Sequence, residues 1–125
     1  MTIPAFDATT VAEHYITAWN ETDAARREAL LAASWTDDAT YVDPLMQGRG
    51  REQISALIGA VHARYPGFRF VRDGQADGHG EHLRFSWTLG PQAQPDLIKG
   101  TNYARLSGRR LQAVTGFLDR VPAGA

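Results

Sequence analysis

The hydrophobic period of the chain changes near Phe68, and this change most constrains the fold. As far as Tyr65, apolar residues recur mainly with the spacing of helices, and from Phe68 onward they alternate with polar ones, as in half-buried strands. Pro66 and Gly67 separate the two regions, because the residue before a proline is pushed out of the helical region. The sequence therefore predicts helices first and an antiparallel sheet afterwards, which is an α+β fold.

Three helices are predicted in the first region. The first begins near Asp7 or Thr9, either of which could cap it, and the second, capped by Thr22 or Asp23, runs from Ala24 to about Ala33. The third runs from about Arg51 to Tyr65. The apolar stripe of the first helix consists of Val11, Tyr15, Ala18 and Trp19. That of the third consists of Ile54, Leu57, Ile58 and Val61. Each stripe lies on one helix face, so we expect both faces to be buried.

One short strand is predicted among the helices and four strands after them. The short strand is Thr40–Asp43, which follows a turn at Trp35–Asp38. The later strands begin at Phe68 and continue with Leu83–Leu89, Leu97–Leu106 and Leu111–Val121, with a turn-rich connection at Gly74–Gly80. We expect the three helices to pack on the concave face of a curved, mostly antiparallel sheet that encloses an apolar pocket.

Composition excludes several classes of protein. The 125 residues suffice for a single domain, and the net charge of −1 gives no general attraction for nucleic acid or anionic membranes. There is no cysteine, no signal peptide and no apolar run of the ~20 residues needed to cross a bilayer. His14, His62, His79 and His82 lack metal-ligand spacing. We expect a cytoplasmic protein with no metal and no cofactor.

Three polar residues occur where apolar ones are expected. Tyr15 lies on the buried stripe of the first helix, Asn102 lies on the apolar face of a strand, and Asp43 ends a strand before Pro44. Each has an ordinary structural interpretation: a core aromatic residue, an amide bonded to backbone or water, and a capping carboxylate. Buried polar groups cost free energy unless they are paired, so the three side chains could instead meet in one cavity.

The segments that contain these residues resemble a known superfamily. The similar pieces are His14–Asn20, Asp37–Thr40, Tyr41–Pro44 and Gly116–Asp119, with Gly48, Arg49 and Ile54 at the expected spacing. The chain resembles the nuclear transport factor 2-like superfamily, in particular its SnoaL-like polyketide cyclase and ketosteroid isomerase branches. This fold hosts many unrelated activities, so the resemblance indicates the fold more specifically than the function.

The resemblance implies roles for individual residues. Ketosteroid isomerase uses an aspartate base with a tyrosine and a protonated aspartate as hydrogen-bond donors. By similarity, Asp43 corresponds to the base, Tyr15 corresponds to the tyrosine, and Asn102 replaces the protonated aspartate. An amide donates a hydrogen bond without a raised pKa, although more weakly. Apolar walls for a flat hydrophobic substrate could come from Trp19, Met46, Phe85, Trp87 and Phe117.

Three hypotheses about function remain open at this stage. The first is an isomerase, cyclase or lyase that acts on an apolar carbonyl compound, and the second is a non-catalytic protein that binds a small hydrophobic molecule. The third is a protein-interaction domain that uses the outer face of the sheet. That face carries Lys99, Thr101, Tyr103 and Arg105, and the resemblance implies a homodimer through it.

Overall fold

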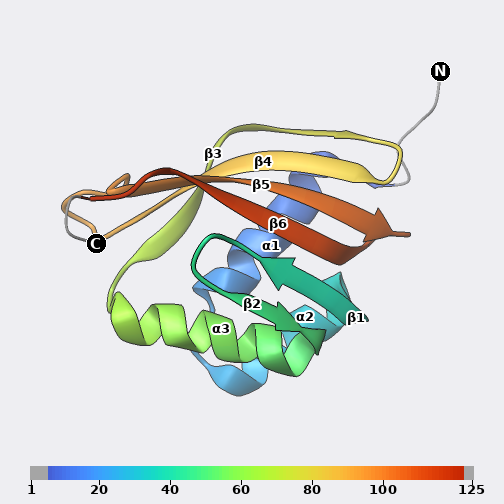
Figure 1. Ribbon diagram of the computed structural model, residues 1–125, viewed down its shortest axis with the longest axis horizontal. Helices are drawn as coiled ribbons and strands as arrows, with labels where there is room; N and C mark the ends of the chain where they lie inside the picture. Colours follow the sequence, from blue (N-terminus) through green and yellow to red (C-terminus); the bar gives the residue numbers. More distant parts are fainter. Residues whose placement is uncertain (1–5, 123–125) are drawn as a thin grey trace.

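The computed structural model describes residues 6–122 and consists of three helices packed on one curved, open sheet of six strands (Figure 1). The elements in chain order are α1 (Ala8–Asn20), α2 (Ala24–Ser34), β1 (Trp35–Val42), β2 (Gln47–Arg49), α3 (Gly50–Arg64), β3 (Arg69–His79), β4 (His82–Gly90), β5 (Ile98–Ser107) and β6 (Arg110–Arg120). The strand order is β2-β1-β6-β5-β4-β3. Only β1 and β6 pair in parallel, so β3 to β6 form the predicted antiparallel meander.

Side-chain caps begin the first two helices at the predicted positions. The Asp7 carboxylate accepts a hydrogen bond from the backbone N–H of Thr10 over 2.9 Å, and Asp23 accepts one from Arg26 over the same distance. Each bond satisfies one of the N–H groups that the first turn of a helix leaves without a partner. Asp7 and Asp23 thus fix where α1 and α2 begin.

Two predicted turns are strands in the structure. The segment predicted as a turn at Trp35–Asp38 is the first half of β1, because Trp35 and Ala39 are both fully buried and β6 pairs with β1 at Trp35 and again from Thr40. The connection predicted at Gly74–Gly80 lies mostly within β3, which continues to His79. Gly74 has a φ of 76° beside a break in the β3–β4 register, so the glycine signal marks a β-bulge. β2 was not predicted at all.

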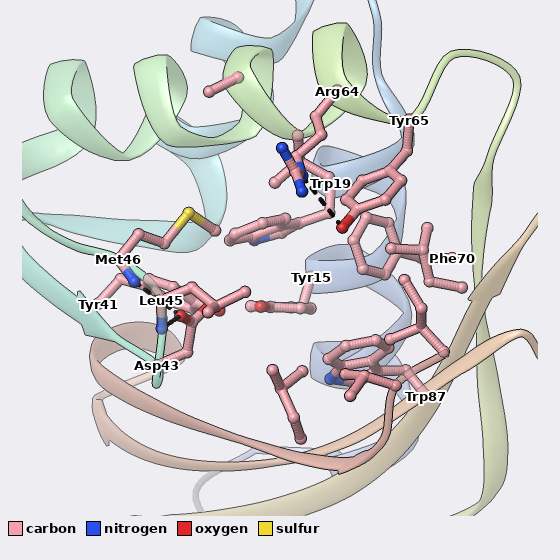
Figure 2. Close-up of a pocket in the computed structure, with 16 residues that line it drawn as sticks. Tyr15, Trp19, Tyr41, Asp43, Leu45, Met46, Arg64, Tyr65, Phe70 and Trp87 are labelled. Carbon is pink, nitrogen blue, oxygen red and sulfur yellow. Dashed lines mark hydrogen bonds between the residues drawn. The ribbon is translucent and has the colours of Figure 1, made fainter. Parts of the chain in front are cut away.

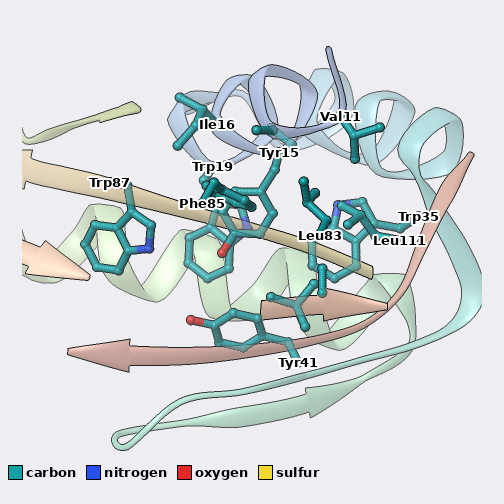
Figure 3. Packing of buried hydrophobic residues seen from close by; sticks show 14 of the residues in the cluster. Val11, Tyr15, Ile16, Trp19, Trp35, Tyr41, Leu83, Phe85, Trp87 and Leu111 are labelled. Atoms are coloured by element: carbon teal, nitrogen blue, oxygen red, sulfur yellow. The ribbon is translucent and has the colours of Figure 1, made fainter. Parts of the chain in front are cut away.

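The core fills the space between α1 and the concave face of the sheet (Figure 3). Tyr15 lies at its centre, with its ring centroid 5.5 Å from that of Trp19, 5.8 Å from Trp35 and 5.1 Å from Phe85. The alternating residues of β4 all face this core, as predicted, and they are Leu83, Phe85, Trp87 and Leu89. Packed aromatic pairs of this kind contribute about 0.5–1.5 kcal/mol each beyond their buried area.

Two polar side chains hold the helices in position around the core. Asn20, at the end of α1, donates to the Phe70 carbonyl over 2.8 Å and accepts from the Phe70 N–H over 2.7 Å. Arg27 is 6% exposed; its Nε donates to Ser55 Oγ over 3.0 Å and its Nη1 donates to the Glu21 carbonyl over 2.9 Å. Asn20 therefore ties α1 to β3, and Arg27 ties α2 to α3 and to the end of α1.

Candidate functional site

A cavity of about 470 Å³ opens between α1, α3, the β1–β2 loop and the sheet (Figure 2). This volume lies in the range that holds small organic ligands. Most lining side chains are apolar or aromatic. The lining residues are Tyr15, Trp19, Tyr41, Asp43, Leu45, Met46, Ala60, Val61, Arg64, Tyr65, Phe70, Trp87, Leu89, Ile98, Leu118 and Val121. The few polar groups among them, above all one carboxylate, therefore determine what the cavity can bind or catalyse.

Asp43 lies directly after β1, is half-buried, and serves two purposes. Its Oδ1 accepts hydrogen bonds from the N–H groups of Leu45 at 2.8 Å and Met46 at 2.9 Å, which closes the turn into β2. Its Oδ2 accepts a bond from the Tyr41 hydroxyl over 2.6 Å, and the residue lines the cavity. The capping and cavity-lining interpretations of Asp43 are therefore compatible, since one residue does both.

The Tyr15 hydroxyl points toward the Tyr41–Asp43 pair (Figure 2). Tyr15 is 2% exposed, and burial is the main cause that raises its pKa; the charge of Asp43 acts in the same direction, while hydrogen bonding from Asn102 and Tyr41 opposes it. Burial also raises the pKa of Tyr41, together with its proximity to Tyr15 and its bond to Asp43. Both phenols therefore stay protonated near neutral pH and remain hydrogen-bond donors.

Asn102 is fully buried behind the cavity wall and does not line the cavity. Its Oδ1 accepts a hydrogen bond from Trp87 Nε1 over 3.0 Å, so Nδ2 is the amide atom whose hydrogen bonds remain to be made. Nδ2 forms no hydrogen bond of ordinary geometry within residues 6–122, but the amide is close enough to the Tyr15 hydroxyl to lower its pKa. The structure thus brings Asn102 next to Tyr15 and not next to the open cavity.

Gly116 on β6 keeps space between the polar groups. A Cβ atom built on Gly116 would lie 3.1 Å from Asn102 Oδ1, 3.2 Å from the Tyr41 hydroxyl and 3.2 Å from Asp43 Cβ. Three side chains from β5, β1 and the β1–β2 loop therefore converge on one point beside Gly116. The missing side chain at this position is what allows them to approach.

The predicted apolar walls divide into two groups. Trp19, Met46 and Trp87 line the cavity. Phe85 is buried beneath it, edge-on to Tyr15, and Phe117 is 55% exposed on the outer face of the sheet. Strand alternation explains the second case, because Gly116 and Leu118 face inward and place Phe117 outward. The structure does not bring Phe85 or Phe117 to the cavity.

Sequence reasoning assigned no role in the site to Tyr41, Arg64 or Tyr65. A signal for Tyr41 existed: it is two residues before Asp43, and side chains two apart in a strand share a face. Arg64 and Tyr65 lie at the end of α3, just before Pro66, and no periodic pattern distinguishes them from solvent-facing residues of a helix end. Their position on the cavity wall depends on how α3 packs.

The six-stranded sheet and its three helices form the cone of the nuclear transport factor 2-like fold. The chain belongs to the family of SnoaL-like domains, whose model matches residues 12–117. No functionally curated protein matches the sequence. Within the described part of the chain, no helix is long and apolar enough to cross a membrane, and no cluster of three or more His, Cys, Asp or Glu side chains could hold a metal ion.

Solved structures include one member of this family that is similar in sequence and others that are similar in fold. A candidate isomerase of the SnoaL-like family from Agrobacterium tumefaciens is 44% identical, with a TM-score of 0.86 over 90% of this chain and 97% of that one. A protein with a ketosteroid isomerase-like fold from Catenulispora acidiphila, solved with trimethylamine, is 20% identical (TM-score 0.72; 88% and 85% covered). A candidate SnoaL-like polyketide cyclase from Jannaschia is 13% identical (TM-score 0.67; 90% and 87% covered). The last two show similarity of fold alone.

Proposed function

We propose that the protein is a small-molecule enzyme that binds an apolar carbonyl compound in the cavity and moves a proton with Asp43. One observation carries this proposal: a carboxylate and two buried phenols meet at one end of a cavity that is otherwise mostly apolar. Proton abstraction next to a carbonyl needs this combination, namely a base together with donors for the oxygen that gains charge.

The chemistry assigns one step to each group. Asp43 removes a proton from the carbon next to the carbonyl, and the electron pair moves to the carbonyl oxygen to form an enolate. The Tyr15 hydroxyl donates a hydrogen bond to that oxygen. In a substrate with a β,γ carbon–carbon double bond the enolate is conjugated to a dienolate, and protonated Asp43 returns the proton to its γ carbon; the double bond moves to the α,β position, which completes an isomerisation. Tyr41 orients Asp43 through the 2.6 Å bond.

Asn102 acts in this scheme as a positioning residue. Its Nδ2 can donate to the Tyr15 oxygen when the Tyr15 O–H turns toward the enolate. That arrangement would satisfy one hydrogen of the Nδ2 group, which lacks a partner within the described residues. Asn102 would thereby strengthen Tyr15 as a donor without touching the substrate.

We also propose that the protein acts as a homodimer through the outer face of the sheet. Thr101 and Lys99 are partly exposed there, and Tyr103, Phe117 and Val71 are 41%, 55% and 51% exposed. No helix of residues 6–122 covers this face, and a mixed polar and aromatic surface of this kind suits contact between two sheets.

A second function is favoured by the hydrogen bonds of Asp43. A carboxylate that accepts two backbone N–H bonds and one phenol bond is also an effective turn cap. On that interpretation the cavity binds a hydrophobic molecule without transforming it, and the tyrosines only select a ligand with a carbonyl group.

Deuterium exchange distinguishes the two functions without knowledge of the natural substrate. 2-Tetralone, a bicyclic ketone with acidic protons beside its carbonyl, would be incubated with the protein in D₂O and followed by NMR. We expect catalysed exchange that falls by about 100-fold or more in Asp43→Asn, since general bases contribute at least that much. Asp38→Asn is the matched control, because Asp38 is an exposed carboxylate on β1 away from the cavity. Unchanged exchange in Asp43→Asn would remove Asp43 as the base, and binding without exchange in the wild type would favour the non-catalytic function.

A further inference from the structure

The charged side chains of the cavity wall come from two different elements. Asp43 is the one anionic lining residue and belongs to the β1–β2 loop. Arg64 is the one cationic lining residue among the described part of the chain, and it comes from the last turn of α3. Figure 2 shows them on separate walls, with apolar side chains between them. A ligand that spans the cavity would therefore meet a carboxylate at one end and a guanidinium group at the other.

Arg64 is held at the cavity by its neighbour. Its Nε is 3.3 Å from the Tyr65 hydroxyl, and its guanidinium carbon is 5.5 Å from the centre of the Tyr65 ring. The Tyr65 ring packs in turn on Phe68, with ring centres 5.0 Å apart. Contacts of this kind orient the guanidinium group and leave its charge available, because neither a hydroxyl nor an aromatic ring neutralises a cation.

Arg64 forms no ion pair within residues 6–122. The basic side chains that do pair with carboxylates there are Arg72, Arg84, Lys99, Arg105 and Arg120. A position in the last turn of a helix is itself favourable for a cation, because the helix dipole is negative there. That benefit does not depend on where the side chain points, so it leaves the contact of Arg64 with the cavity unexplained.

We propose that the natural ligand carries a carboxylate that binds to Arg64, while its carbonyl group lies at Tyr15 and Asp43. A planar guanidinium group binds a carboxylate through two parallel N–H bonds, which fixes orientation as well as affinity. Asp43 repels the same carboxylate, so the ligand enters with its acidic group toward α3. The substrate class is then an apolar keto acid. This inference rests on the proposed function for the carbonyl end and on Arg64 for the acidic end.

Paired probes with the same apolar body test the acidic end alone. The probes are 6-acetyl-2-naphthoic acid and its methyl ester, which differ only in charge and in one methyl group. Binding would be measured by calorimetry at low salt. We expect the acid to bind about fivefold to tenfold more tightly than the ester, because Arg64 is exposed at the cavity mouth and its ion pair is partly hydrated. Added salt should reduce this preference.

Variants assign the preference to one side chain. Arg64→Gln should bring the two affinities close together, and Arg64→Lys should retain part of the preference. Arg69→Gln is the matched control: Arg69 is exposed, carries the same charge and does not line the cavity, so the preference should persist. Equal binding of acid and ester by the wild type, or an unchanged preference in a folded Arg64→Gln variant, would overturn the proposal.

The same probes separate this proposal from the catalytic one. Asp43→Asn should keep or increase the preference for the acid, because it removes the repelling charge. Exchange of the acetyl protons in D₂O reports only on Asp43 and Tyr15. Absence of exchange together with a preference for the acid would refute the catalytic function and support the carboxylate site. Exchange without a preference for the acid would support the catalytic function and refute the carboxylate site.

Discussion

Replacing Gly100 with alanine is expected to destabilise the protein, because the new methyl group would displace the Trp87 indole. Gly100 on β5 pairs directly with Trp87 on β4. A Cβ atom at Gly100 would lie 2.1 Å from Trp87 Cζ2 and 2.5 Å from Cε2. Carbon atoms pack at about 3.5–4 Å, so either the ring or the strand has to move.

The cost follows from how firmly Trp87 is held. The side chain is 7% exposed, and its Nε1 donates to Asn102 Oδ1 over 3.0 Å. Overpacking a core of this kind costs about 1–3 kcal/mol, and loss of the hydrogen bond adds about 1 kcal/mol. Replacement of a glycine offsets about 0.4–1 kcal/mol through the unfolded chain. We therefore expect the free energy of unfolding to fall by about 2 kcal/mol.

Urea unfolding followed by circular dichroism measures this change. Gly59→Ala on α3 is the control, because the nearest contact of its Cβ would be Arg27 Nη2 at 3.3 Å, and the end of an arginine side chain can shift slightly. We expect it to change stability by less than about 1 kcal/mol. In a Trp87→Leu background, Gly100→Ala should lose most of its cost. Wild-type stability for Gly100→Ala, or an equal cost with and without the indole, would refute the reasoning.

Two further predictions concern pH and association. Because folding raises the pKa of Tyr15 and Tyr41, their contribution to stability is fully present below about pH 10 and is lost as the pH rises further. Urea unfolding across alkaline pH should show this loss. A Tyr15→Phe variant whose free energy of unfolding falls as steeply with pH as that of the wild type would contradict it. Sedimentation should show a dimer at micromolar concentration that Tyr103→Asp dissociates into monomers, whereas a monomeric wild type would exclude the proposed interface.

The sequence by itself determined the elements that depend on nearby residues. The change of period at Phe68, the Asp7 and Asp23 caps and the alternation Leu83–Leu89 each reflect interactions within one helix or strand, and the structure contains all of them. The family resemblance supplied the overall cone and directed attention to Asp43, which does line the cavity.

Only the tertiary structure decided which parts of the chain meet across long distances. The first half of β1 reads locally as an Asp-rich turn, and it is extended because it connects Trp35, which pairs with Leu111 of β6, to Thr40–Val42, which pair with Ala113–Thr115. Phe117 was a candidate wall, but the register of β6 turns it outward. Asn102 faces inward as predicted, yet it contacts Trp87 and Tyr15, which line the cavity, and does not line the cavity itself.

The position of α3 is the clearest example of this division. Local periodicity predicts where α3 lies in the sequence, and the structure places it within one residue of that prediction. Nothing local indicates that its last turn reaches the cavity, because the position of that turn depends on packing against α2, β1 and β2. A helix forms from contacts three and four residues apart, whereas a site forms from side chains that only the completed fold brings together. For that reason Arg64 enters the functional argument only once the chain is folded.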